Sequence, residues 1–268
     1  MRPGGLQLGA LAALLAVLSW LGGCTTTVQG SDGRDIPTQN EPADAERRAR
    51  VRLELAALYF GRGQGTTALE EVQRALAAKP DLADAFSLRG LVQASLGDNT
   101  LAEASFRRAL ELAPRDGGVM HNFGWFLCQQ RRFDDADAQF VAAVTQPGYR
   151  DVPRTLLAQG VCQARAGLWT AAERSLSRAF ELDPANPAAS FNLAEVLLHR
   201  GELERARFYV RRVNAQPEQV SAQSLWLAAR IERRMGNMGE LQSLGSQLRE
   251  RFPQSPENQQ FERGRFDE

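Results

Sequence analysis

The sequence lacks an excess of charge of either sign. Its 268 residues include 32 lysines and arginines and 32 aspartates and glutamates, so the formal net charge at pH 7 is zero. A protein that binds nucleic acid needs a basic surface that neutralises phosphates and releases their counterions. We therefore set nucleic acid aside as a partner.

Side chains suited to catalysis or metal binding are also scarce. The two histidines, His121 and His199, have no second histidine or cysteine three or four residues away, as a metal site on one helix requires. The acidic pairs at 70–71 and 134–135 fall in or next to expected second helices, where carboxylates favour helix starts and solvated faces. No phosphate-binding glycine loop or nucleophile elbow occurs. The sequence thus predicts no catalytic residues, no metal, no cofactor and no small-molecule substrate.

No apolar run is long enough to span a bilayer as a helix. The longest, Leu6 to Leu21, is shorter than the roughly 18 to 20 residues that a transmembrane helix needs. It follows the basic Arg2, leads through small residues to Cys24, and precedes the first acidic residue, Asp32. This order is typical of a bacterial lipoprotein signal, so we expect residues 1–23 to be removed and the cysteine to be lipidated. An ordinary secretory signal and a spanning anchor are the alternatives.

Lipidation would decide where the protein lies. Each buried methylene contributes about 0.8 kcal/mol, so one acyl chain holds a protein marginally, whereas the several chains of a lipoprotein anchor it in the bilayer. Thr25 follows the cysteine, where lipoproteins kept in the inner membrane often carry aspartate. We therefore expect the outer membrane, with the protein facing the periplasm. Residues 24–48 are polar and lack helical periodicity, which predicts a lipidated N-terminus and flexible tether.

The sequence after the tether repeats itself. Pro80 and Pro114 are 34 residues apart, and the later steps to Pro184 and Pro253 are close to twice that spacing. A period of 34 is that of the tetratricopeptide repeat, a pair of antiparallel helices. The sequence therefore predicts an all-α fold, a right-handed superhelical solenoid of about six such repeats over residues 49–255. The expected repeats are 49–82, 83–116, 117–150, 153–186, 187–220 and 222–255, followed by a cap or frayed tail at 256–268.

Two cysteines fall on the first helices of consecutive repeats. Cys128 and Cys162 are 34 residues apart, and packed helices bring facing positions within the roughly 4.4 to 6.8 Å between Cα atoms that a disulfide needs. An oxidising periplasm favours the bridge, which would contribute about 3 to 4 kcal/mol in the chain-entropy model. A two-residue insertion within 145–152 gives the cysteines different places in their repeats, so two buried free thiols are the alternative. We also expect the superhelix to bend or loosen at this insertion.

The first helices of a tetratricopeptide stack line a concave face that binds peptides. In the first three repeats this face is predicted to be apolar, which suits an amphipathic segment or an added strand, and in the last repeat it is predicted to be basic, which suits carboxylates or acidic lipid head groups. The alternative is that these side chains pack between repeats or are merely solvated. The predicted groove residues are Leu53, Ala57, Phe60, Leu91, Ala94 and Trp125, and the predicted contacts to acidic groups are Arg230, Arg233 and Arg234.

Several segments carry a more specific likeness. They are Asn122 to Gln129, Tyr149 to Asp151, Gly160 to Cys162, and Ser224 to Ala228. In these segments the chain resembles the type IV pilus biogenesis and stability lipoproteins of the PilW or PilF family. The resemblance implies a pilotin, an outer-membrane lipoprotein that brings the pilus secretin to the membrane and supports its oligomerisation. We expect the first three repeats to contact the secretin, and the protein to be a monomer when unbound.

Two other functions remain open at this point. A tetratricopeptide lipoprotein that docks murein hydrolases or synthases would pull down cell-wall enzymes, and its loss would alter division or cell shape. A subunit of outer-membrane protein assembly would, when depleted, reduce many β-barrel proteins at once. The paired cysteines and the late segment around Trp226 favour the pilotin over both.

Overall fold

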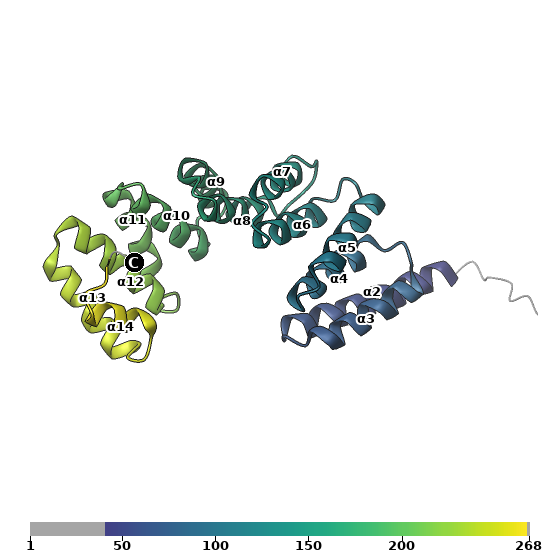
Figure 1. Ribbon diagram of the computed structural model, residues 1–268, viewed down its shortest axis with the longest axis horizontal. Coiled ribbons are helices and arrows are strands. Elements are labelled where there is room, and N and C mark those ends of the chain that lie inside the picture. Colours follow the sequence, from purple (N-terminus) through teal and green to yellow (C-terminus); the bar gives the residue numbers. More distant parts are fainter. Residues whose placement is uncertain (1–40, 267–268) are drawn as a thin grey trace, which may run out of the picture. The chain divides into compact units, whose positions relative to one another are not determined.

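The computed structural model describes residues 41–266, and in this part of the chain thirteen helices are present and no strand (Figure 1). Twelve of the helices form antiparallel pairs, each joined by a short turn, and the last follows alone. The pairs are α2 (Glu41–Gly61) with α3 (Gly65–Ala78), α4 (Ala83–Ser95) with α5 (Asn99–Leu112), α6 (Gly117–Gln129) with α7 (Phe133–Val144), α8 (Val152–Arg165) with α9 (Trp169–Leu182), α10 (Pro187–His199) with α11 (Leu203–Asn214), and α12 (Ala222–Met235) with α13 (Met238–Arg251). The single helix is α14 (Pro256–Glu262).

These six pairs confirm the predicted all-α array of tetratricopeptide repeats. From the second repeat onward, each first helix begins at the predicted residue or one residue before it. The second helix of each pair packs against the first helix of the next pair, so every repeat covers the apolar face of its neighbour.

The first helix begins earlier than the sequence pattern indicated. Helix α2 starts at Glu41, so residues 41–48, which we expected in the tether, are helical. Alanine, glutamate and arginine make up most of this stretch, and all three are strong helix formers. Helix propensity and ion pairs one turn apart stabilise the helix here, so it forms without a periodic pattern of apolar residues. The pairs join Arg47 to Asp44 at 3.6 Å and Arg50 to Glu46 at 2.8 Å.

The predicted membrane-targeting features lie outside the described residues. These features are the signal at 1–23, the lipidated Cys24 and the tether as far as residue 40. Among the helices between residues 41 and 266, none is both long enough and apolar enough to cross a bilayer. The lipid anchor therefore remains a prediction from the sequence.

Close packing within the second, third and fourth pairs depends on a glycine in each first helix. Each of these glycines faces a large side chain of the second helix, and a Cβ atom there would collide with it. An added Cβ would lie 2.8 Å from the Phe106 ring at Gly90, 2.9 Å from Phe140 at Gly124, and 2.5 Å from Leu176 at Gly160. These three large side chains are fully buried, so the repeated spacing of glycine and bulky residue builds the core of the second, third and fourth pairs.

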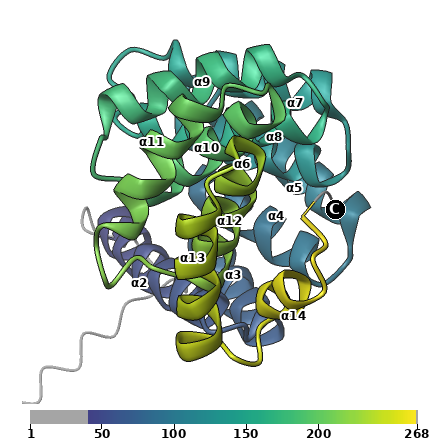
Figure 2. The ribbon, with the colours of Figure 1, turned by 90° about the vertical axis from the view of Figure 1, so that its left-hand side faces the viewer.

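The C-terminal residues form a cap on the last repeat. Helix α14 packs against α12 and α13, and Ser255 caps its N-terminus by accepting a hydrogen bond from the Asn258 backbone N–H at 3.1 Å (Figure 2). Phe261 and Phe266 place their ring centroids 6.5 and 5.1 Å from that of Trp226. The three aromatic rings cover the apolar surface that the last repeat would otherwise expose.

Candidate functional site

The predicted apolar groove residues do not all lie free on the first-helix face. Leu53 of α2 packs against the core shared by the first two repeats, while Leu91, Ala94 and Trp125 are half-buried against the core around Phe106. Ala57 is exposed and Phe60 is half-buried. Much of this apolar strip therefore joins adjacent repeats, which leaves a smaller open area in the first three repeats than the sequence pattern indicates.

The three C-terminal arginines on α12 all contact other parts of the chain. Arg230 Nε donates to the Phe266 carbonyl at 3.3 Å, and the Arg233 guanidinium lies 5.8 Å from the centroid of the Phe266 ring. Arg234 donates to the Leu198 carbonyl of the preceding repeat at 3.2 Å. These arginines hold the cap and the neighbouring repeat, so part of their hydrogen-bonding capacity is already in use.

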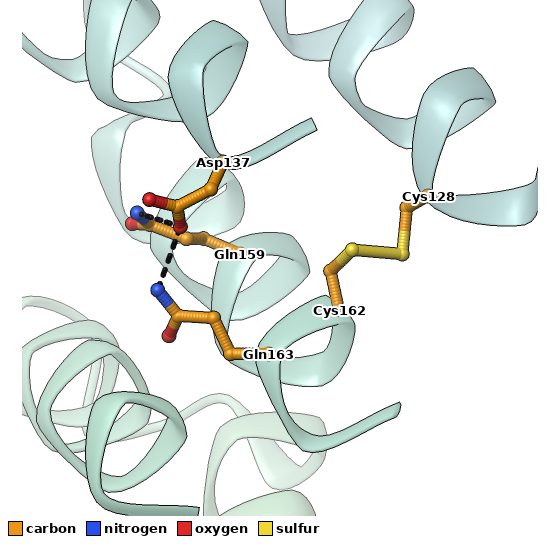
Figure 3. The surroundings of a disulfide bond; sticks show 5 residues. All are labelled: Cys128, Asp137, Gln159, Cys162 and Gln163. Carbon is orange, nitrogen blue, oxygen red and sulfur yellow. Dashed lines mark hydrogen bonds between the residues drawn. A yellow bond between two sulfur atoms is a disulfide. The ribbon is translucent and has the colours of Figure 1, made fainter. Parts of the chain in front are cut away.

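A disulfide joins the third and fourth repeats. Cys128 of α6 and Cys162 of α8 are both buried, and their Cα atoms are 5.8 Å apart (Figure 3). Beside the bridge, Asp137 of α7 accepts a hydrogen bond from Gln159 at 2.9 Å and another from Gln163 at 2.7 Å. The covalent bond and the polar cluster fix α8 against both helices of the preceding repeat.

The insertion between these repeats is packed rather than loose. The Tyr149 hydroxyl lies 2.7 Å from Thr155 Oγ1, and that oxygen lies 2.9 Å from Nδ1 of the buried His121. The Tyr149 ring also fills the space beside Gly117, where a Cβ atom would lie 2.6 Å from it. Burial lowers the pKa of His121 to about 4, with the nearby Arg154 adding to the effect, so the ring is neutral at pH 7. The side chains of the insertion therefore strengthen the junction that we expected to loosen.

A hollow of about 290 Å³ opens on the first-helix face between α8, α9 and α10. Its volume lies just below the roughly 300 to 1,000 Å³ of small-molecule sites, so it suits one large side chain of a partner. Residues that line it include Val161, Ala164, Arg165, Trp169, Glu195 and His199.

One wall of this hollow is an aromatic stack. The rings of Trp169 and His199 are nearly parallel, with an interplanar angle of 9° and centroids 4.2 Å apart. Burial lowers the pKa of His199, and the positive charges of Arg230 and Arg234 lower it further. The Glu195 carboxylate acts in the other direction and raises this pKa in part. The histidine is therefore neutral at pH 7, and the stack offers an uncharged aromatic surface.

The sequence contained a signal for this hollow that the groove prediction missed. The ninth place of the repeat, which pointed to Leu91 and Trp125, holds Val161 in the fourth repeat and Glu195 in the fifth. The thirteenth place, which pointed to Arg234 in the last repeat, holds Arg165 in the fourth repeat and His199 in the fifth. The prediction used those places only near the two ends of the array. Nowhere in residues 41–266 are three histidine, cysteine or acidic side chains placed to share a metal ion.

Comparison with known proteins agrees with the repeat array. The tetratricopeptide-repeat family matches residues 53–117 and 163–230. The chain is 28% identical over 253 residues to the type IV pilus assembly protein PilF of Pseudomonas aeruginosa, which covers 94% of this chain and 97% of that protein. An uncharacterized Haemophilus influenzae protein is 30% identical over 101 residues, which is 38% of this chain and 56% of that protein.

Two solved structures share the fold over most of the chain. The crystal structure of PilW, described as a widely conserved type IV pilus biogenesis factor, has a TM-score of 0.73 and 29% identity, covering 79% of this chain and 96% of that one. The structure of Pseudomonas aeruginosa PilF has a TM-score of 0.71 and 24% identity, covering 82% of this chain and 99% of that one.

The helix pairs, their spacing and the family matches define this chain as a tetratricopeptide-repeat protein. It is homologous to PilF and PilW, proteins of type IV pilus biogenesis, over most of its length. The homology confirms the resemblance that the sequence segments indicated. These relatives are named as pilus biogenesis proteins and not as enzymes.

Proposed function

We propose that this protein is a pilotin of type IV pilus biogenesis, a lipoprotein of the outer membrane that binds the secretin and promotes its localisation and oligomerisation there. The observation that carries the proposal is the likeness to PilF, which extends over 94% of this chain and 97% of that protein. The complete repeat array supports it, because a pilotin acts by binding and needs no catalytic centre.

The anchor would set where the captured secretin is held. With acyl chains on Cys24, the sixteen residues before α2 limit the distance between the bilayer and the first helix to about 55 Å when fully extended. A secretin subunit bound to the repeats would thus stay close to the outer membrane. This restriction raises its effective concentration at the place where the ring assembles.

The first-helix face would hold the secretin segment. An extended or helical segment there can place one large apolar side chain against Trp169 and His199, in the hollow between the fourth and fifth repeats. The disulfide and the polar cluster around Asp137 keep the neighbouring helices in fixed positions. A preformed face loses little conformational freedom on binding, which favours affinity.

Deletion of the gene tests this function. We expect the secretin to remain as monomers in the inner-membrane fraction, while bulk outer-membrane proteins stay at normal levels. The readout is the amount of heat-resistant secretin multimer in separated membranes. Complementation with the wild-type gene should restore the multimers, and complementation with Cys24→Ala should restore them poorly although the repeats stay folded.

Other outcomes of the same experiment would replace the proposal. Intact secretin multimers in the outer membrane of the deletion strain would contradict a pilotin function. Loss of many outer-membrane proteins together would indicate a general assembly function instead. Full activity of Cys24→Ala, with the absence of lipid verified by mass spectrometry, would contradict the anchoring role.

A further inference from the structure

The turn inside each helix pair contains one residue with a positive φ angle, always at the fifteenth place of the repeat. In five repeats this residue is glycine, with φ between 74° and 88°, and in the third repeat it is Arg131, with φ of 61°. A left-handed backbone is unfavourable for an L-residue because its Cβ atom approaches a carbonyl oxygen, and glycine avoids this cost. The third repeat therefore has an arginine where the backbone favours glycine. The five glycines are Gly63, Gly97, Gly167, Gly201 and Gly236.

Contacts within the chain do not explain this arginine. A Cβ atom added to any of the five glycines would meet no atom within 4 Å, so space neither requires nor excludes a side chain at the turn. Arg131 has no side-chain hydrogen bond, ion pair or ring contact among the described residues. Its neighbour Arg132, in contrast, donates to Glu103 at 2.9 Å and to Asp135 at 2.8 Å.

Arg131 shares a hollow of about 420 Å³ with a second arginine, Arg165 of α8. The Arg165 guanidinium lies 5.8 Å from the centroid of the Trp125 ring and has no acidic partner in the described part of the chain. No acidic residue lines this hollow, whereas an adjoining hollow is lined by Asp134 and Asp135 and also by Arg131. Two arginines that form no ion pair within the described residues therefore line one hollow. Its other lining residues are Cys128, Gln129 and Phe133.

We propose that Arg131 and Arg165 bind a carboxylate of the protein partner, the side chain of an aspartate or glutamate in a segment that lies on the first-helix face. Guanidinium groups present planar sets of N–H donors that match the two oxygens of a carboxylate. Arg165 also lines the hollow that Trp169 and His199 wall. The recognised segment therefore carries an acidic residue close to a large apolar one.

The inference rests on the proposed function only for the name of the partner, the secretin. The carboxylate preference follows from the two arginines themselves. The neutral net charge of the chain disfavours a long polyanion, whereas a single carboxylate needs only the local positive charge of this hollow.

Random-sequence peptides displayed on phage and selected on the full chain test the preference. On wild-type protein we expect enriched peptides to share an acidic residue next to an aromatic or aliphatic one. The double variant Arg131→Gly/Arg165→Gln should lose the acidic preference, and the matched control Arg132→Gln should keep it. An acidic preference that persists in the double variant, or wild-type selection that enriches no acidic residue or no sequence at all, would overturn the inference.

The unfavourable backbone allows a second readout that separates binding from folding. We expect Arg131→Gly to keep or raise Tm, by about 2 °C, because glycine relieves the left-handed conformation. The same variant should bind the best enriched peptide at least about tenfold more weakly, as loss of charge-assisted hydrogen bonds predicts. Gly97→Arg, which places an arginine at the equivalent turn of the second repeat, should lower Tm without changing affinity.

The results distinguish this inference from the proposed function. A fall in Tm of Arg131→Gly with unchanged peptide affinity would assign Arg131 a structural role and overturn the carboxylate site. If Arg131→Gly instead weakened binding to phosphatidylglycerol vesicles about tenfold and left peptide binding unchanged, the site would be assigned to lipid and the carboxylate inference would be overturned as well. If peptides show the acidic preference but purified secretin does not bind the wild-type chain, the carboxylate site stands and the pilotin proposal fails.

Discussion

His121 is a buried histidine at the junction between the third and fourth repeats. Its Nδ1 atom lies 2.9 Å from Thr155 Oγ1 across the boundary between these repeats. Its pKa is about 4 in the folded chain, against an ordinary value of 6.5, because burial penalises the charged ring. The folded state therefore leaves this histidine unprotonated at a pH where the unfolded chain binds a proton.

Stability should consequently depend on pH in a defined window. The contribution of His121 is fully present above pH 6.5 and is lost as the pH falls from 6.5 to 4, by a total of about 3 kcal/mol. Urea unfolding at pH 7 and pH 4.5 checks this, with His121→Gln as the control because glutamine keeps a hydrogen-bonding group that does not titrate. An equal loss of stability in wild type and variant would show that other groups cause the pH dependence.

At the scale of helices, the disulfide joins two first helices that are consecutive in the stack. It connects α6 to α8, across the insertion that breaks the 34-residue period. Each helix pair contacts only its neighbours, so a weak junction would allow the array to open locally without unfolding elsewhere. The bridge, the Asp137 cluster and the contact between Tyr149 and Thr155 all lie at this one junction.

Removing the bridge should weaken this junction specifically. We expect Cys128→Ser to lower Tm by several degrees, since a closed loop of this length contributes about 3 to 4 kcal/mol in the chain-entropy model. Thiol titration of the denatured variant should reveal one thiol more than in wild type. The double variant Cys128→Ser/Cys162→Ser should be about as unstable with no additional thiol. An unchanged thiol count in the single variant would mean that the purified protein carries no bridge.

Most of the helical array follows from the sequence alone, because the 34-residue period and the glycines that face bulky residues report packing directly. The early start of α2 at Glu41 was missed because propensity and ion pairs, rather than an apolar stripe, sustain that segment. The groove was predicted less well. A residue's position in the repeat indicates on which face of the array its side chain lies, but not how deeply that side chain is buried. Leu53 and Leu91 lie partly in the core.

One site residue was visible in the sequence but was not recognised. The fifteenth place of the third repeat holds Arg131, where every other repeat holds glycine. The substitution becomes informative only when the backbone is seen to keep its positive φ angle there. Sequence alone does not distinguish an arginine that keeps the positive φ angle from one in a turn that has changed its conformation.

At the scale of the whole molecule, the first helices, the turns that follow them and the start of α9 supply the features that the proposed function requires. The aromatic hollow of the fourth and fifth repeats and the two arginines beside the disulfide share Arg165 as a common lining residue. Second helices instead carry exposed apolar side chains such as Phe208, whose neighbours Arg207 and Arg211 form ion pairs with the buried Glu232. We therefore propose that the partner binds on the first-helix face.

Photo-crosslinking in living cells tests this assignment most directly. A photoreactive amino acid is placed at Asn192, in the aromatic hollow, and in a matched strain at Phe208 of α11, which is 59% exposed. We expect a crosslink between Asn192 and the secretin and none from Phe208, and we expect Arg131→Gly to weaken the Asn192 crosslink. A secretin crosslink from Phe208 alone, or none from either position while pili assemble normally, would contradict binding on the first-helix face.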